Sequence, residues 1–150
     1  LYVVNNGVLT RLHRLQGGGV QVTKRIASVV ELNFEEAELL KRTISRDDER
    51  FRDVQKAYHS CLDRAFSEFR QVLDQYQRDT GISVQTIYLT GSASQFPGVQ
   101  SRLQDALRVE VLKAHPFGRV AYPAFMEDVM YDIGPTFTPA LGAALRQFDL

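Results

Sequence analysis

Residues 87–98 read Ile-Tyr-Leu-Thr-Gly-Ser-Ala-Ser-Gln-Phe-Pro-Gly, an apolar run followed by small residues and a proline. The apolar run predicts a buried strand over about 84–90, and Pro97 predicts the start of a helix because proline is favoured in the first helical turn. Small residues let a ligand approach the backbone closely, and the first turn of a helix has unpaired N–H groups. The pattern is typical of a ligand cradle in an α/β protein, and it is equally typical of a plain turn that binds nothing.

The N-terminal region, residues 1–15, predicts a β-hairpin. Strand-like apolar runs lie on both sides of Asn6 and Gly7, and Asn-Gly is a strong hairpin signal because both residues tolerate positive φ. Three glycines at 17–19 then lead into a predicted helix over about 20–31, where apolar residues recur at helical spacing.

Two further helices are predicted before the strand at 84–90. Asn33 and Glu36 have the spacing of a capping box, which predicts a helix over about 34–44. The longest periodic pattern covers residues 48–78, where apolar residues recur at steps of three and four. This pattern predicts one long helix, and Gly81 predicts its end.

The C-terminal third predicts more strand and helix. An apolar run at 109–112 indicates a second strand, and a short helix is predicted over about 124–131. Gly-Pro at 134–135 predicts a break, and Thr-Pro at 138–139 predicts the cap of a final helix. The order of these elements predicts an α/β fold with one mixed sheet and packed helices.

The composition describes one globular domain over residues 1–150, with 44% hydrophobic and 24% charged residues. The formal net charge of zero gives no reason to expect a surface for nucleic acid or anionic membrane. No apolar run approaches the roughly 18 residues of a membrane-spanning helix, so no transmembrane segment is expected. The single cysteine, Cys61, cannot form an internal disulfide and favours a cytoplasmic location.

Glu38 and Lys41 are the candidate ligand side chains, three residues apart on one face of a predicted helix. A carboxylate accepts hydrogen bonds from sugar hydroxyls, and a lysine presents a mobile positive charge. The same spacing is also typical of an exposed ion pair with no ligand, and both interpretations stay open. No residues are predicted to be catalytic or to bind metal, since the three histidines are far apart in the sequence.

Several passages, taken in order, resemble the second lobe of an actin-like nucleotide-binding protein. The likeness is greatest to the family of the type IV pilus assembly protein PilM, and the cell-division protein FtsA is a more distant relative. The matching passages include a Gly-Gly and Ile-Ala segment, an Ala-Glu-x-x-Lys helix, a Glu-Phe-Arg run with a trailing tyrosine, a Leu-Thr-Gly loop and a closing Ala-Leu-Gly helix. They lie at residues 18–27, 34–41, 68–76, 87–91 and 138–146.

The resemblance implies an actin-like ATPase (ribonuclease H-like) lobe, a fragment of a two-lobed protein with a short helical insertion over about 45–64. In such proteins the two lobes close on ATP and Mg²⁺. The family's ribose and base contacts would correspond to Glu38 and Lys41, the adenosine loop to Gly91 and Ser92, and the phosphate-side turn to Gly18 and Gly19.

Two departures from the family pattern bear on activity. Ser92 stands where the family usually has a second glycine, and the family's two Asp-x-Gly phosphate motifs are expected upstream of Leu1. Without those carboxylates nothing obvious holds Mg²⁺ or orients water. The chain is therefore expected not to be an enzyme by itself, at most a weak ATPase when completed by the missing lobe, and to bind no nucleotide alone.

The resemblance implies a cytoplasmic scaffold of type IV pilus assembly, or of a related type II secretion-like system, peripheral to the inner membrane through its partners. The implied partner is the cytoplasmic tail of an inner-membrane pilus assembly protein, PilN in the family. Two alternatives stay open: a fragment of an ATP-dependent sugar or acid kinase, and a fragment of an FtsA-like filament protein. A homodimer is also compatible with the sequence, since a severed lobe would expose apolar area.

Overall fold

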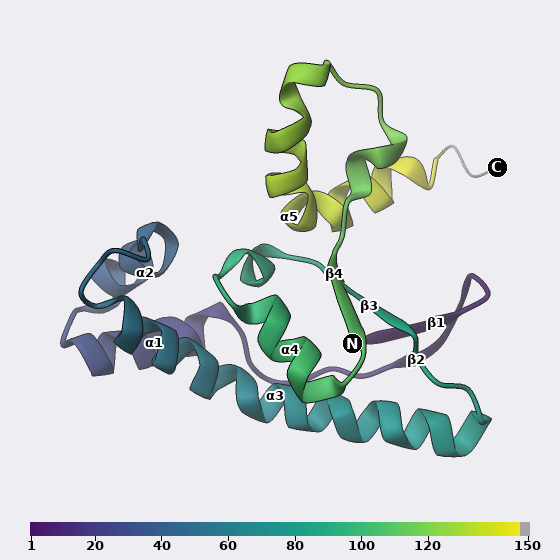
Figure 1. Cartoon of the computed structure of the whole chain (residues 1–150), viewed down its shortest axis with the longest axis horizontal. Coiled ribbons are helices and arrows are strands. Elements are labelled where there is room, and N and C mark those ends of the chain that lie inside the picture. Colours follow the sequence, from purple (N-terminus) through teal and green to yellow (C-terminus); the bar gives the residue numbers. More distant parts are fainter. Residues whose placement is uncertain (148–150) are drawn as a thin grey trace. The chain divides into compact units, whose positions relative to one another are not determined.

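The computed structural model of this chain describes residues 1–147 (Figure 1). Its contacts divide the chain into two compact units, Leu1–Ser83 and Val84–Leu150. Helices and short strands occur in both units, which confirms the predicted α/β class of fold. The predictions of a single domain over 1–150 and of an insertion over about 45–64 stay predictions.

The first unit begins with the predicted β-hairpin. Strand β1 (Tyr2–Asn5) pairs antiparallel with β2 (Val8–Leu12). The two residues between the strands, Asn6 and Gly7, have φ values of 48° and 77°. A two-residue loop with positive φ at both positions matches the twist of the strands that it joins, which explains why Asn-Gly closes this hairpin.

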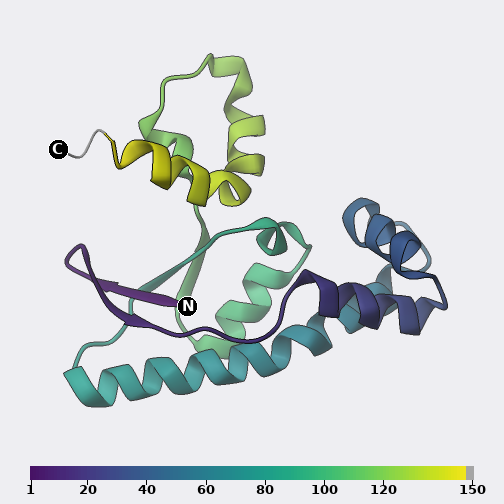
Figure 2. The ribbon, with the colours of Figure 1, turned by 180° about the vertical axis from the view of Figure 1, so that it is seen from behind.

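Three helices complete the first unit, and each confirms a prediction. They are α1 (Gly19–Val30), α2 (Phe34–Thr43) and α3 (Phe51–Thr80). Helix α1 packs against both α2 and α3, and Figure 2 shows α1 alongside the long α3. Helix α3 ends where Gly81 adopts the left-handed conformation at φ 71°, which glycine tolerates without strain.

The capping box predicted for α2 is present in both directions. The Asn33 side chain accepts from the Glu36 N–H at 2.9 Å, and the Glu36 carboxylate accepts from the Asn33 N–H at 3.1 Å. These bonds satisfy two backbone N–H groups. One of them, the N–H of Glu36 in the first turn, has no acceptor within the helix. Apolar side chains from β1 and all three helices form the core of this unit. They are Val3, Val22, Ile26, Ala37, Leu40, Val54, Ala57, Tyr58, Phe66, Leu73 and Tyr76.

The second unit contains a parallel strand pair. Strands β3 (Thr86–Leu89) and β4 (Glu110–Lys113) pair in parallel, and α4 (Val99–Leu107) connects them. The outward-facing backbone of Val111 in β4 bonds to side chains of α4 instead of a further strand. Its carbonyl accepts from Gln100 Nε2 at 2.7 Å, and its N–H donates to Gln104 Oε1 at 3.3 Å.

Within each unit the described strands form a two-stranded sheet, antiparallel in the first unit and parallel in the second. The prediction that all of them belong to one mixed sheet stays a prediction. On the outer side of β4, the two glutamines of α4 occupy hydrogen-bonding positions that another strand would need.

The helix predicted to start at Pro97 begins two residues later, at Val99. Val99 N–H donates to the Phe96 carbonyl at 3.2 Å, and Gly98 has φ 86° and ψ −5°. These features indicate a type II turn, in which proline and glycine take the two central positions. Pro97 therefore belongs to a turn, and a short 3-10 helix, η1 (Ser92–Gln95), comes before it.

The two helices predicted on either side of Gly134-Pro135 are one helix, α5 (Glu127–Leu145), with Pro135 and Pro139 inside it. Figures 1 and 2 show that α5 bends sharply along its length. Proline inside a helix removes a hydrogen bond and bends the axis without always ending the helix. Two 3-10 helices, η2 (Pro116–Arg119) and η3 (Ala124–Met126), lie between β4 and α5.

Candidate functional site

Four of the six predicted site residues lie in the first unit, where the start of α1 meets α2. Lys41 Nζ lies 2.6 Å from Glu38 Oε2, 2.8 Å from Thr23 Oγ1 and 3.3 Å from the Gly19 carbonyl. The structure thus brings Gly19, Glu38 and Lys41 into one polar cluster, together with Thr23. We call these four residues the α1–α2 cluster.

Thr23 is the member of the α1–α2 cluster that the sequence analysis missed. It is fully buried, and its hydroxyl lies within hydrogen-bonding distance of the Gly19 carbonyl, at 2.8 Å, and of Glu38 Oε2. The available signal was its position four residues after Gly19, which places both on one face of a helix. That signal becomes informative only when α2 is known to pack against α1.

The ammonium group of Lys41 is fully engaged within the protein. A lysine has three N–H donors, and the three acceptors of the α1–α2 cluster lie around it. Its side chain is only 15% exposed. Lys41 therefore ties α2 to the first turn of α1, and a ligand contact would require it to give up one of these bonds.

Glu38 keeps accessible acceptor capacity. Its Oε2 faces Lys41 and Thr23, while its Oε1 accepts from the exposed side chain of Arg42 at 2.8 Å. The hydrogen bond from Lys41, followed by that from Thr23, lowers the pKa of Glu38 from 4.5 to about 2. The carboxylate is therefore ionised at neutral pH, and an ionised carboxylate accepts hydrogen bonds without donating any.

The two glycines predicted at the phosphate-side turn have different surroundings. Gly18 is the N-cap of α1, and a Cβ there would meet nothing within 4 Å. Gly19 is the first residue of α1, and a Cβ there would lie 3.3 Å from Lys41 Nζ. Only Gly19 is restricted in size by the α1–α2 cluster.

Gly91 and Ser92 lie in the second unit, directly after β3. Gly91 has φ 84° and ψ 166°, a conformation almost restricted to glycine. Its N–H donates to the Pro135 carbonyl of α5 at 2.6 Å, and its carbonyl accepts from Ser94 Oγ at 2.7 Å. Ser92 is exposed and starts η1. The prediction that these two residues share a cleft with Glu38 and Lys41 stays a prediction.

A groove in the first unit is lined by none of the predicted site residues. It has a volume of about 600 Å³ and is bounded by β2, the residue after it and one face of α3. Its walls carry Arg11, Leu12, His13, Glu68, Gln71, Val72 and Gln75. The α1–α2 cluster is a surface of hydrogen-bonding groups and does not line this hollow.

Within residues 1–147, no group of three or more histidine, cysteine, aspartate or glutamate side chains comes together in a way that could hold a metal ion. In the same part of the chain, none of the helices combines the length and the apolar character needed to cross a membrane.

The fold resembles that of a protein solved in a pilus biogenesis complex. A solved structure described as "PilM-PilN type IV pilus biogenesis complex" matches with a TM-score of 0.68 and 31% sequence identity, over 83% of this chain and 35% of that chain. The present chain thus spans about one third of that relative's length. No curated protein matches the sequence significantly.

The family itself is shown by a second comparison. The family described as "Type IV pilus assembly protein PilM" matches residues 1–148. The chain therefore belongs to the PilM family, as its resemblance predicted.

Proposed function

We propose that this chain forms the second lobe of a scaffold protein in type IV pilus assembly, and that the complete protein binds ATP between its lobes. The family match over residues 1–148 carries this proposal. It favours the pilus system over the kinase and cell-division alternatives. A scaffold binds its nucleotide and its partner without needing rapid turnover, so weak hydrolysis at most is expected.

Glu38 is the residue we assign to the ribose. Its carboxylate is ionised, and among the described contacts it accepts from Lys41, Thr23 and Arg42. A carboxylate offers about four acceptor positions, so a ribose hydroxyl can donate to a remaining one on Oε1. Lys41 then acts mainly by holding Glu38 in place, because its own three donors are engaged.

Gly91 and Ser92 are assigned to the adenosine. The small residues of this loop would let the adenosine come close to the backbone, and the exposed Ser92 provides a hydroxyl beside it. Mg²⁺ would neutralise charge on the phosphates of bound ATP. In the family pattern its protein ligands are the Asp-x-Gly carboxylates, which we expect in the remainder of the complete protein.

The proposed partner is the cytoplasmic tail of a PilN-like inner-membrane protein. The relative with 31% identity is described as a PilM-PilN complex, which supports this choice of partner. Binding such a tail would place the protein in the cytoplasm at the inner membrane. Neither nucleic acid nor a homodimer is needed for this role.

Calorimetric titration of the whole protein with Mg-ATP tests the nucleotide part. We expect binding in the wild type and at least about tenfold weaker binding in Glu38→Gln, because the lost charge corresponds to about 1.4 kcal/mol or more. Glu35→Gln is the matched control, since Glu35 is exposed in the first turn of the same helix. Equal affinity in the two variants would remove Glu38 from the site, and absence of binding to the wild type would overturn the nucleotide proposal.

Fluorescence anisotropy tests the partner. A labelled peptide with the sequence of the PilN-like tail from the same cell is titrated with the whole protein, and saturable binding is expected. A scrambled peptide of the same composition is the control. If both peptides bind equally, or neither does, the proposed partner is wrong.

A further inference from the structure

The two prolines of α5 are four residues apart, and this spacing has a specific consequence. In an α-helix each carbonyl accepts from the N–H four residues later. Pro139 has no N–H, so the carbonyl of Pro135 lacks the donor that the regular helix pattern would supply. A buried carbonyl without a donor destabilises a fold, and Pro135 is fully buried.

The missing donor is replaced by Gly91. Its N–H lies 2.6 Å from the Pro135 carbonyl, a short hydrogen bond between the residue two positions after β3 and the bend of α5. Gly91 reaches this position with φ 84° and ψ 166°, which a residue with a side chain rarely adopts. The glycine is therefore required by a bond to α5, whether or not a ligand binds.

A second contact joins the same two segments. Gln95, the last residue of η1, donates through Nε2 to the carbonyl of Asp132, one turn before Pro135. The loop is also fixed internally, because Ser94 donates to the Gly91 carbonyl through both its N–H, at 3.1 Å, and its hydroxyl. The start and the end of η1 are thus both held by α5.

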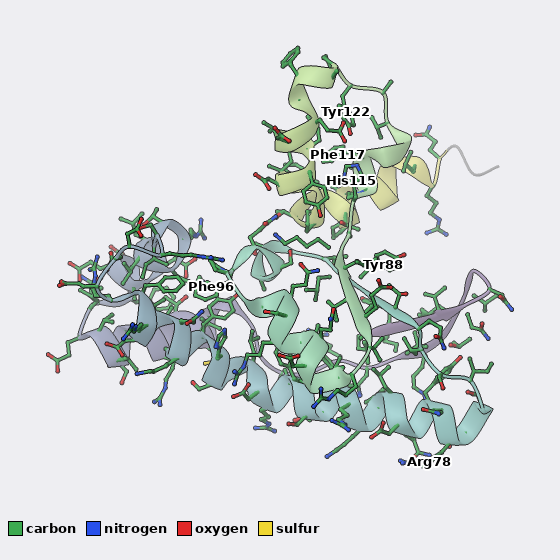
Figure 3. All side chains as sticks on the ribbon, viewed as in Figure 1. Arg78, Tyr88, Phe96, His115, Phe117 and Tyr122 are labelled. Carbon is green, nitrogen blue, oxygen red and sulfur yellow. The ribbon has the colours of Figure 1, made fainter. Side chains whose placement is uncertain are left out.

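The bend of α5 also packs against the segment between β4 and α5. A Cβ at Gly134 would lie 3.1 Å from Pro116 Cδ and 3.4 Å from the Ala114 carbonyl. Phe117 contacts Tyr122 and Phe137, with ring centroids 6.5 Å and 6.3 Å apart. Figure 3 shows His115, Phe117 and Tyr122 gathered beside α5. This packing restricts the position of the Pro135 carbonyl.

We infer that Pro139 is a positioning residue for the Gly91 loop. By withholding its N–H, Pro139 leaves the Pro135 carbonyl available to Gly91, and this bond fixes residues 91–95 against α5. Any effect of Pro139 on nucleotide affinity rests on the proposed function, in which this loop contacts the adenosine. The positioning of the loop by Pro139 is independent of the proposed function.

Hydrogen exchange of backbone amides, followed by NMR on the whole protein, tests the inference. In the wild type the Gly91 amide should be strongly protected. Pro139→Ala restores an N–H that competes for the Pro135 carbonyl, so Gly91 should exchange at least about tenfold faster. Gly142→Ala is the matched control in the same helix, because a Cβ there meets nothing within 4 Å.

Two results would overturn the positioning role. One is an unprotected Gly91 amide in the wild type, which needs no variant and so does not depend on whether Pro139→Ala folds. The other is unchanged protection of Gly91 in a folded Pro139→Ala.

Titration with Mg-ATP separates this inference from the proposed function. Pro139→Ala should bind several times more weakly than Gly142→Ala. Equal affinity with a faster-exchanging Gly91 would overturn the link to the ligand. A wild type that does not bind ATP would overturn the proposed function, and the exchange of Gly91 would still decide whether Pro139 positions the loop.

Discussion

The α1–α2 cluster and the Gly91 loop differ in the chemical groups from which they are built. The cluster depends mainly on the side chains of Thr23, Glu38 and Lys41. The loop depends largely on backbone groups, the N–H of Gly91 and the carbonyl of Pro135. A sequence motif records side chains, whereas nearly every residue has the same backbone groups. Motif analysis therefore finds the first kind of site more easily than the second.

The largest effect is expected for Gly91→Ala, which perturbs the Gly91 loop, the region that depends on backbone groups. Alanine at φ 84° and ψ 166° is strained, so the free energy of unfolding should fall by about 1–3 kcal/mol. Denaturant unfolding measures this. Gly142→Ala is the control and should be neutral or slightly stabilising, since it lies in a helix with open space around it. Similar losses in both variants would contradict the role of Gly91.

Thr23→Val tests the side-chain-built cluster. Valine keeps the shape of threonine and removes the buried hydroxyl, so stability should fall by about 1–2 kcal/mol. Thr43→Val is closely matched, because Thr43 also donates to the carbonyl four residues earlier, at 2.9 Å, but is exposed. The thermal midpoint of Thr43→Val should change little. If the two variants lose equal stability, the burial of Thr23 does not matter.

Acid should weaken the α1–α2 cluster through Glu38. The pKa of Glu38 is lowered from 4.5 to about 2, first by the hydrogen bond from Lys41. Because the folded pKa lies below the unfolded one, this stabilisation is present above about pH 4.5 and is lost as the pH falls toward 2. The stability difference between wild type and Glu38→Gln should therefore shrink over that range. The difference for Glu35→Gln should change less, and a parallel response of the two would contradict the assignment.

The smallest effect is expected for Arg42→Ala. Arg42 pairs with Glu38 at 2.8 Å, but its side chain is 72% exposed. An exposed helical pair of this kind contributes at most about 0.5 kcal/mol. Arg64→Ala removes a similar exposed pair, with Glu68 at 3.0 Å, and should have the same small effect on urea unfolding. A clearly larger loss in Arg42→Ala would show that Glu38 depends on it.

Local signals predicted much of the fold. The Asn6-Gly7 turn, the capping box of Asn33 and Glu36, and the end of α3 at Gly81 are each determined by a few neighbouring residues. Helical spacing likewise predicted that Glu38 and Lys41 interact. These features could be predicted because their partners lie within four residues in the sequence.

The features that were missed depend on distant partners. Pro135 and Pro139 predicted a break in α5, and the continuous helix depends on packing against η2 and on the bond from Gly91. The role of Thr23 depends on Glu38 of α2, fifteen residues away along the chain. Pro97 is a local exception, because proline is favoured both in the first turn of a helix and before glycine in a type II turn, so the residue types alone do not distinguish the two.

The glutamines of α4 limit how the parallel sheet can grow. Gln100 and Gln104 saturate the outward backbone groups of Val111, so an incoming chain would have to displace both amides to add to β4. Uncovered strand borders recruit foreign chains and promote aggregation. Two residues of the connecting helix protect this border at Val111, so adding a strand beside β4 would cost the two hydrogen bonds that they make.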